Sequence, residues 1–189
     1  MPVSHSEANL ALADVARTRR RASRFLGYRR AGPHLQVWGL VWLLGYGLPA
    51  VLPGLSEGWT WTLLDIVGVT ASIRLSLKTA GEEELPGLSR LASLRMMATF
   101  AVIFLFVGAT LAVMHPANPA AWRVYPALVL GAIYAAVGIY ALPRFLVIAA
   151  VLAGASLLAF FLAPQVLSLV ISLVGGGGLV LGGFWMRRI

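Results

Sequence analysis

The chain has 189 residues, of which 59% are hydrophobic and only 12% are charged, and it carries a formal net charge of +8 with no cysteine. A soluble domain is usually about half apolar and about a quarter charged, so this composition indicates a membrane protein without a soluble catalytic module. The lack of cysteine excludes disulfides, thiolate chemistry, iron–sulfur clusters and cysteine-ligated zinc. The abundance of Ala, Leu, Gly and Arg is typical of a bacterial source.

Residues 1–30 form a polar segment ahead of the first apolar stretch. A capping-box pattern at residues 4–7 predicts a helix that starts near residue 5. The helical repeat places basic residues on one face and apolar residues on the other, so we expect a cytoplasmic amphipathic helix that lies on anionic headgroups. The residues expected to bind headgroups are Arg17, Arg20, Arg21, Arg24, Arg29 and Arg30. Gly32-Pro33 is expected to end this helix before the first span.

Six apolar stretches follow, and each is long enough to cross a bilayer as a helix of about 20 residues. We predict spans at about residues 35–52, 59–77, 95–114, 122–142, 145–163 and 166–185. Residues 31–189 are therefore predicted to form one transmembrane domain, an all-α bundle of six helices. Short loops should make antiparallel neighbours of the first and second spans, the fourth and fifth, and the fifth and sixth.

The longest internal loop, residues 78–94, contains three consecutive glutamates followed by a proline. Leucines recur at every third position from Leu85 to Leu94. This spacing predicts a short interfacial helix with its acidic residues at the N-terminus, where the helix dipole stabilises negative charge.

The positive charges are strongly asymmetric about these spans. Every Lys and Arg except Arg123 lies on the side that also holds both chain termini. Because positively charged loops resist translocation, we expect an inner-membrane protein with cytoplasmic termini. The basic residues lie next to spans, so lipid headgroups are the expected partner and nucleic acid is not.

Asp65 is the one acidic residue inside a predicted span. The helical repeat places it on a polar stripe with Thr62, Gly68, Ser72 and Ser76. A carboxylate in hydrocarbon is costly, so this residue needs a role. One interpretation is a path for an ion, a proton or a solute. The other is a buried group that holds helices in register through a hydrogen bond to a neighbour such as Tyr134 or Tyr140.

Aromatic residues recur every four positions on the first span, at Trp38, Trp42 and Tyr46. Such a stripe could wall a pocket for a hydrophobic or cationic ligand. Packing and interfacial anchoring are commoner uses of aromatic residues at this spacing.

The sixth span contains four consecutive glycines, residues 175–178, and two more at positions 182 and 183. Gly175, Gly178 and Gly182 are candidates for a packing face, because glycine lets helix backbones approach closely. That face could pack within the chain, in a homo-oligomer or against a membrane partner protein. The glycine run also weakens the helix, so a hinge or an unwound cavity-lining segment is an alternative.

Catalytic motifs such as Gly-x-Ser-x-Gly and His-Glu-x-x-His are missing, and the three histidines lack the spacing of metal ligands. We therefore expect no enzyme activity, no metal and no cofactor. Our first hypothesis is a non-enzymatic accessory, regulatory or self-associating membrane component. The alternative is a small ion, proton or solute channel or transporter that uses the polar face around Asp65.

Overall fold

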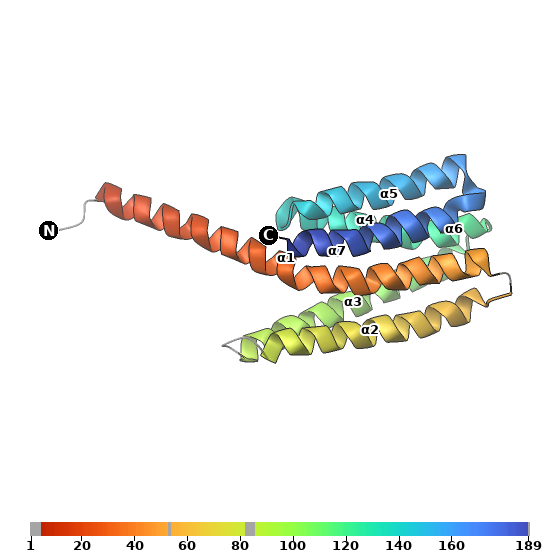
Figure 1. Ribbon diagram of the computed structural model, residues 1–189, viewed down its shortest axis with the longest axis horizontal. Coiled ribbons are helices and arrows are strands. Elements are labelled where there is room, and N and C mark those ends of the chain that lie inside the picture. The colour runs from red at the N-terminus through yellow and green to blue at the C-terminus, as the bar shows by residue number, and fades with distance from the viewer. Residues whose placement is uncertain (1–4, 53, 82–85, 189) are drawn as a thin grey trace.

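The computed structural model describes residues 5–52, 54–81 and 86–188, with the side chains of residues 5–11, 20, 79–81, 86–93, 96, 97 and 100 outside the description. The helices are α1 (His5–Val51), α2 (Glu57–Gly81), α3 (Pro86–Met114), α4 (Pro119–Tyr140) and α5 (Arg144–Leu162). A last segment consists of a 3₁₀ turn, η1 (Pro164–Val166), then α6 (Leu167–Val170), a π-helical stretch, η2 (Ile171–Gly176), and α7 (Gly177–Arg187). These elements lie side by side in an up-and-down bundle (Figure 1).

The predicted all-α fold is confirmed, since the described residues contain helices and no strand. Among those residues, three helical segments are long and apolar enough to cross a membrane: Pro119–Tyr140, Arg144–Leu162 and Pro164–Arg187. A shorter apolar helical stretch covers Ala101–Met114. The first two predicted spans correspond to α1 and α2, which carry more polar side chains, including Gln36 and Asp65.

The predicted helix break at Gly32-Pro33 is wrong, because α1 continues through Pro33 as one helix of 47 residues. Proline removes one backbone hydrogen bond from a helix interior. Tertiary packing holds the helix together here, since Tyr28 and Leu35, on either side of Pro33, are buried against Phe145 and Met186. The separate interfacial helix expected before the third span is also wrong, since α3 runs without interruption from Pro86.

Helix α1 packs closely against the last helical segment. A Cβ atom added at Gly32 would lie 2.9 Å from the carbonyl oxygen of Gly183, and one added at Gly39 would lie 2.8 Å from that of Gly176. The Ser172 hydroxyl donates a hydrogen bond of 2.7 Å to the carbonyl oxygen of Leu43 on α1. The two backbones therefore touch along a face on which only glycine fits.

The other faces of the bundle also use small residues. A Cβ atom at Gly182 would lie 2.8 Å from the Ile148 side chain on α5, and one at Gly138 on α4 would lie 2.7 Å from the backbone nitrogen of Leu146. The expected neighbours, α1 with α2, α4 with α5, and α5 with the last segment, are confirmed. The contact between α1 and α7 joins the two ends of the chain and was not expected from loop lengths.

The N-terminal part of α1 extends beyond the bundle as a continuation of the same helix (Figure 1). The predicted headgroup-binding residues Arg17, Arg21, Arg24, Arg29 and Arg30 are exposed, and the Arg20 side chain lies outside the described residues.

Arg144 anchors the base of this arm. Its backbone N–H donates to the Tyr28 hydroxyl (3.2 Å), its guanidinium donates to the carbonyl oxygen of Trp185 (2.9 Å), and it lies over both aromatic rings.

We predict that Gly176→Ala destabilises the protein by about 1–3 kcal/mol, the usual cost of overpacking. The added methyl group would lie 2.5 Å from the Leu43 backbone nitrogen, and backbone has little freedom to move away. The measurement is the thermal unfolding midpoint of the purified protein in detergent, followed by circular dichroism.

Gly177→Ala is the matched control, because a Cβ atom there meets nothing within 4 Å. Alanine is up to about 1 kcal/mol better than glycine in a helix, so this variant should unfold at the same or a higher temperature. Equal midpoints for the two variants would contradict the proposed role of the backbone contact.

Candidate functional site

A cavity of about 1100 Å³ lies between α1, α2, α3 and α4. One end is lined by Glu57, Arg123 and Gln165, and the other by Gly27, Arg30 and His34. The cavity therefore extends along most of the bundle. Its lining is mainly apolar and rich in aromatic side chains, which is the usual character of a small-molecule site.

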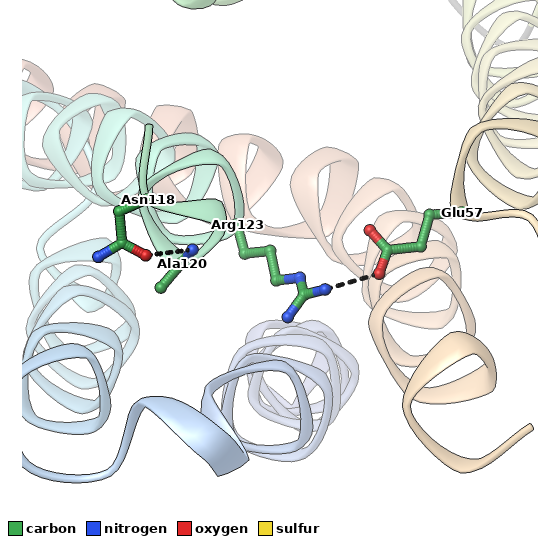
Figure 2. Close-up of polar contacts among 4 residues, drawn as sticks. All are labelled: Glu57, Asn118, Ala120 and Arg123. Atoms are coloured by element: carbon green, nitrogen blue, oxygen red, sulfur yellow. Dashed lines mark hydrogen bonds and ion pairs between the residues drawn. The ribbon is translucent and has the colours of Figure 1, made fainter. Parts of the chain in front are cut away.

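An ion pair lies at the end of the cavity near the loops that begin α2 and α4 (Figure 2). Helix α4 starts with Asn118, whose side-chain oxygen accepts a hydrogen bond of 2.9 Å from the Ala120 N–H, and Pro119 fits the first helical turn. This start places Arg123 one turn into α4, where its guanidinium donates to the Glu57 carboxylate at 2.8 Å. The carbonyl oxygen of Arg123 accepts a hydrogen bond of 2.9 Å from the Tyr46 hydroxyl. The backbone and side chain of Arg123 thus join α4 to both α1 and α2.

The aromatic stripe of α1 forms one wall of the cavity. Tyr46 packs edge-on against Trp42 and against Trp61 of α2, with ring centroids 5.5 and 4.9 Å apart. Further along the cavity, Trp38 packs against Phe104 at 5.7 Å and donates a hydrogen bond of 3.2 Å to the Ser72 hydroxyl. The stripe is buried in the core, as the packing interpretation expects, and it also lines the cavity, as the pocket interpretation expects.

Asp65 is half-buried and lines the same cavity. Trp61 packs against Gly45, and Gly68 lies against Val41, so the antiparallel pairing of α1 and α2 brings Asp65 level with Trp42. Among the residues that the structure describes, none donates a hydrogen bond or forms an ion pair to this carboxylate. Neither tyrosine suggested as its partner bonds to it: Tyr134 lines the cavity, and Tyr140 is 89% exposed.

The other members of the predicted polar stripe do not act together. Ser76 lines the cavity with Asp65, whereas Gly68 and Ser72 face α1 and contact Trp38. Thr62 is exposed, and its hydroxyl donates to the carbonyl oxygen of Gly58 in its own helix. Of the predicted polar stripe, Asp65 and Ser76 therefore line the cavity, whereas Thr62, Gly68 and Ser72 do not.

The glycines predicted to form a packing face lie on different surfaces of the last segment. Gly175 and Gly182 face Leu152 and Ile148 of α5, and a Cβ atom at Gly178 would meet nothing within 4 Å. Of the basic residues expected to bind headgroups, Arg30 also lines the end of the cavity beside His34.

Sequence reasoning missed Glu57, Trp61 and Arg123 as members of the site. The pairing of Glu57 with Arg123 joins residues far apart in the chain and leaves no local pattern. Trp61 had a usable signal, because it precedes Asp65 by four residues and therefore shares its helix face.

Comparisons with protein-family models, curated proteins and solved structures found no match to this chain. The described residues also contain no group of three His, Cys, Asp or Glu side chains that could hold a metal ion. The site is therefore interpreted from its own geometry.

We predict that Tyr46→Phe lowers the free energy of unfolding by about 1 kcal/mol, the usual contribution of one hydrogen bond. The variant removes the bond from the Tyr46 hydroxyl to the Arg123 carbonyl while leaving the ring in place. Thermal unfolding in detergent measures the effect. Tyr140→Phe is the control, because that tyrosine is exposed and its hydroxyl has no bonded partner in the described part of the chain. An unchanged midpoint for Tyr46→Phe would show that this bond does not hold α1 to α4.

Proposed function

We propose that this chain is a non-enzymatic, multi-pass membrane protein that takes up a small solute in the cavity between α1, α2, α3 and α4, as a transporter or channel does. The observation that carries the proposal is the cavity itself, which extends along most of the bundle and contains one carboxylate without a partner among the described residues. An ionisable residue inside a membrane helix most often serves a substrate or ion pathway.

Three observations support six spans. The helices lie side by side with their loops at alternating ends (Figure 1), and every Lys and Arg except Arg123 lies toward the end where both termini are found or in the adjoining arm. The outside of the bundle is also strongly apolar, with Leu105, Val113 and Phe161 exposed to 72%, 81% and 73%. Lipid suits such a surface, whereas water would drive it to aggregate.

The structure supports a solute-binding role better than a self-associating scaffold. The glycines that suggested association mostly contact α1 and α5 within the chain. The exposed arm supports an additional, separate proposal. Its arginines and the exposed apolar side chains of Leu12, Val15 and Leu26 suit attachment to anionic headgroups on the cytoplasmic leaflet.

We predict that single cysteines at Ser56 and Ala117 react with a membrane-impermeant maleimide added to intact cells, because six spans place both loops outside. Cysteines at Ser23 and Ala141 should react only after the cells are permeabilised. The native chain contains no cysteine, so every signal comes from the introduced thiol. Protection of the cysteine at Ser56 in intact cells would contradict six spans, even if the last three helices crossed as expected.

A second prediction concerns water in the cavity. Cysteines at the cavity-lining positions Ser76 and Ser168 should react with a small cationic methanethiosulfonate in nanodiscs, since this chemistry needs a hydrated thiolate. Cysteines at Leu105 and Leu158 are the controls, because these exposed positions would face lipid. Equal reactivity at all four positions, or none at Ser76 and Ser168, would contradict a solute path.

A further inference from the structure

The charges that line the cavity are arranged unevenly along it. At one end the Arg123 guanidinium is neutralised by Glu57, and at the other Arg30 lies beside His34. Asp65 is eight residues beyond Glu57 on α2, or about 12 Å along the helix axis. Asp65 is level with Trp42 of α1. Trp42 is twelve residues from Arg30 on that helix, which is roughly 18 Å along the helix axis. The middle of the cavity therefore has one negative charge and no nearby cation from the described residues that line it.

The walls around this charge are aromatic. Trp42, Tyr46 and Trp61 form a chain of edge-on contacts, with centroid separations of 5.5 and 4.9 Å. Trp61 precedes Asp65 by one helical turn, so the carboxylate and the indole belong to the same side of α2. Aromatic faces attract cations through their quadrupole, and the attraction grows when the cation is desolvated.

From these two features we infer that the cavity binds an organic cation with apolar substituents, held by Asp65 as counter-ion and by the rings of Trp42, Tyr46 and Trp61. This inference rests on the proposed function and specifies the chemical class of its solute. A hydrated metal ion suits the site less well, because the described residues contain no group of three His, Cys, Asp or Glu side chains that could hold one. An organic anion would meet the uncompensated charge of Asp65. The apolar walls favour substituents that a small inorganic cation lacks.

The test uses two molecules of nearly the same shape and opposite charge, tetraphenylphosphonium and tetraphenylborate. The full-length protein is placed in nanodiscs of neutral phosphatidylcholine, and the binding of radiolabelled tetraphenylphosphonium is measured by equilibrium dialysis. Empty nanodiscs of the same lipid correct for partition into the bilayer. The binding of tetraphenylborate is measured in separate dialysis cells that contain no tetraphenylphosphonium, because the two ions precipitate together. We expect saturable binding of tetraphenylphosphonium and none of tetraphenylborate. No saturable binding of the cation, or equally strong saturable binding of the anion, would overturn the inference.

Variants locate the charge that the cation recognises. Asp65→Asn should weaken binding roughly tenfold or more, because it removes one partner of a buried charge pair. Asp14→Asn is the matched control, since it makes the same chemical change at an exposed position on the arm and should bind like the native protein. Asp65→Glu keeps the charge and should retain most of the binding, which separates loss of charge from failure to fold. Native affinity in Asp65→Asn would overturn the inference, as would equal losses in Asp65→Asn and Asp65→Glu with both variants folded.

This experiment can fail without the proposed function failing. If the cysteines at Ser76 and Ser168 react as expected and tetraphenylphosphonium does not bind, the cavity is hydrated but its solute is not an organic cation, and only the present inference is lost. If those cysteines do not react, the proposed function itself is wrong.

Discussion

The arrangement of this molecule depends on the contact between α1 and the last helical segment, where glycine meets glycine. Gly32 and Gly39 are seven residues apart, as are Gly176 and Gly183, so in an antiparallel pair the two contacts lie about two turns apart on the same face. One turn beyond the contact of Gly39 with Gly176, the Ser172 hydroxyl donates a hydrogen bond to the Leu43 carbonyl oxygen. Ser172 belongs to the π-helical stretch of the last segment. Any side chain at these positions would separate the two helices. The glycines therefore determine how α1 is placed, and α1 carries the aromatic residues of the cavity.

The cavity follows from what is attached to the other sides of α1. The α2–α3 hairpin packs on α1 through Trp61 against Gly45 and Gly68 against Val41, and α4 is tied to α1 and α2 by Tyr46, Arg123 and Glu57. The rings of Trp38, Trp42, Tyr46 and Trp61 line the space between these helices. A carboxylate in such a space is costly unless a partner or water reaches it. The position of Asp65 is therefore the strongest structural support for the proposed solute-binding role.

Much of the local structure could be predicted because it depends on composition and spacing. The apolar stretches and their short loops predicted the bounds of α4 and α5 to within about three residues. The two errors had different causes. Gly32-Pro33 looks like a helix boundary when only local preference is considered, whereas the segment that begins at Pro86 was correctly expected to be helical but was wrongly separated from the third span. Burial of Tyr28 and Leu35 against distant residues overrode that preference at Pro33. The spacing of Trp38, Trp42 and Tyr46 correctly placed them on one face but did not show which helices that face would meet.

The sequence by itself determined that this is an all-helical chain with apolar segments suited to lipid, because hydrophobicity, helical periodicity and the placement of arginines are local properties of the chain. Only the tertiary structure decided that α1 packs on the last segment, that four glycines of that segment contact α1 or α5, and that Asp65 shares a cavity with aromatic residues of α1. Those facts depend on which helix faces meet across long separations in sequence, and close packing between distant backbones leaves no periodic trace in either segment alone.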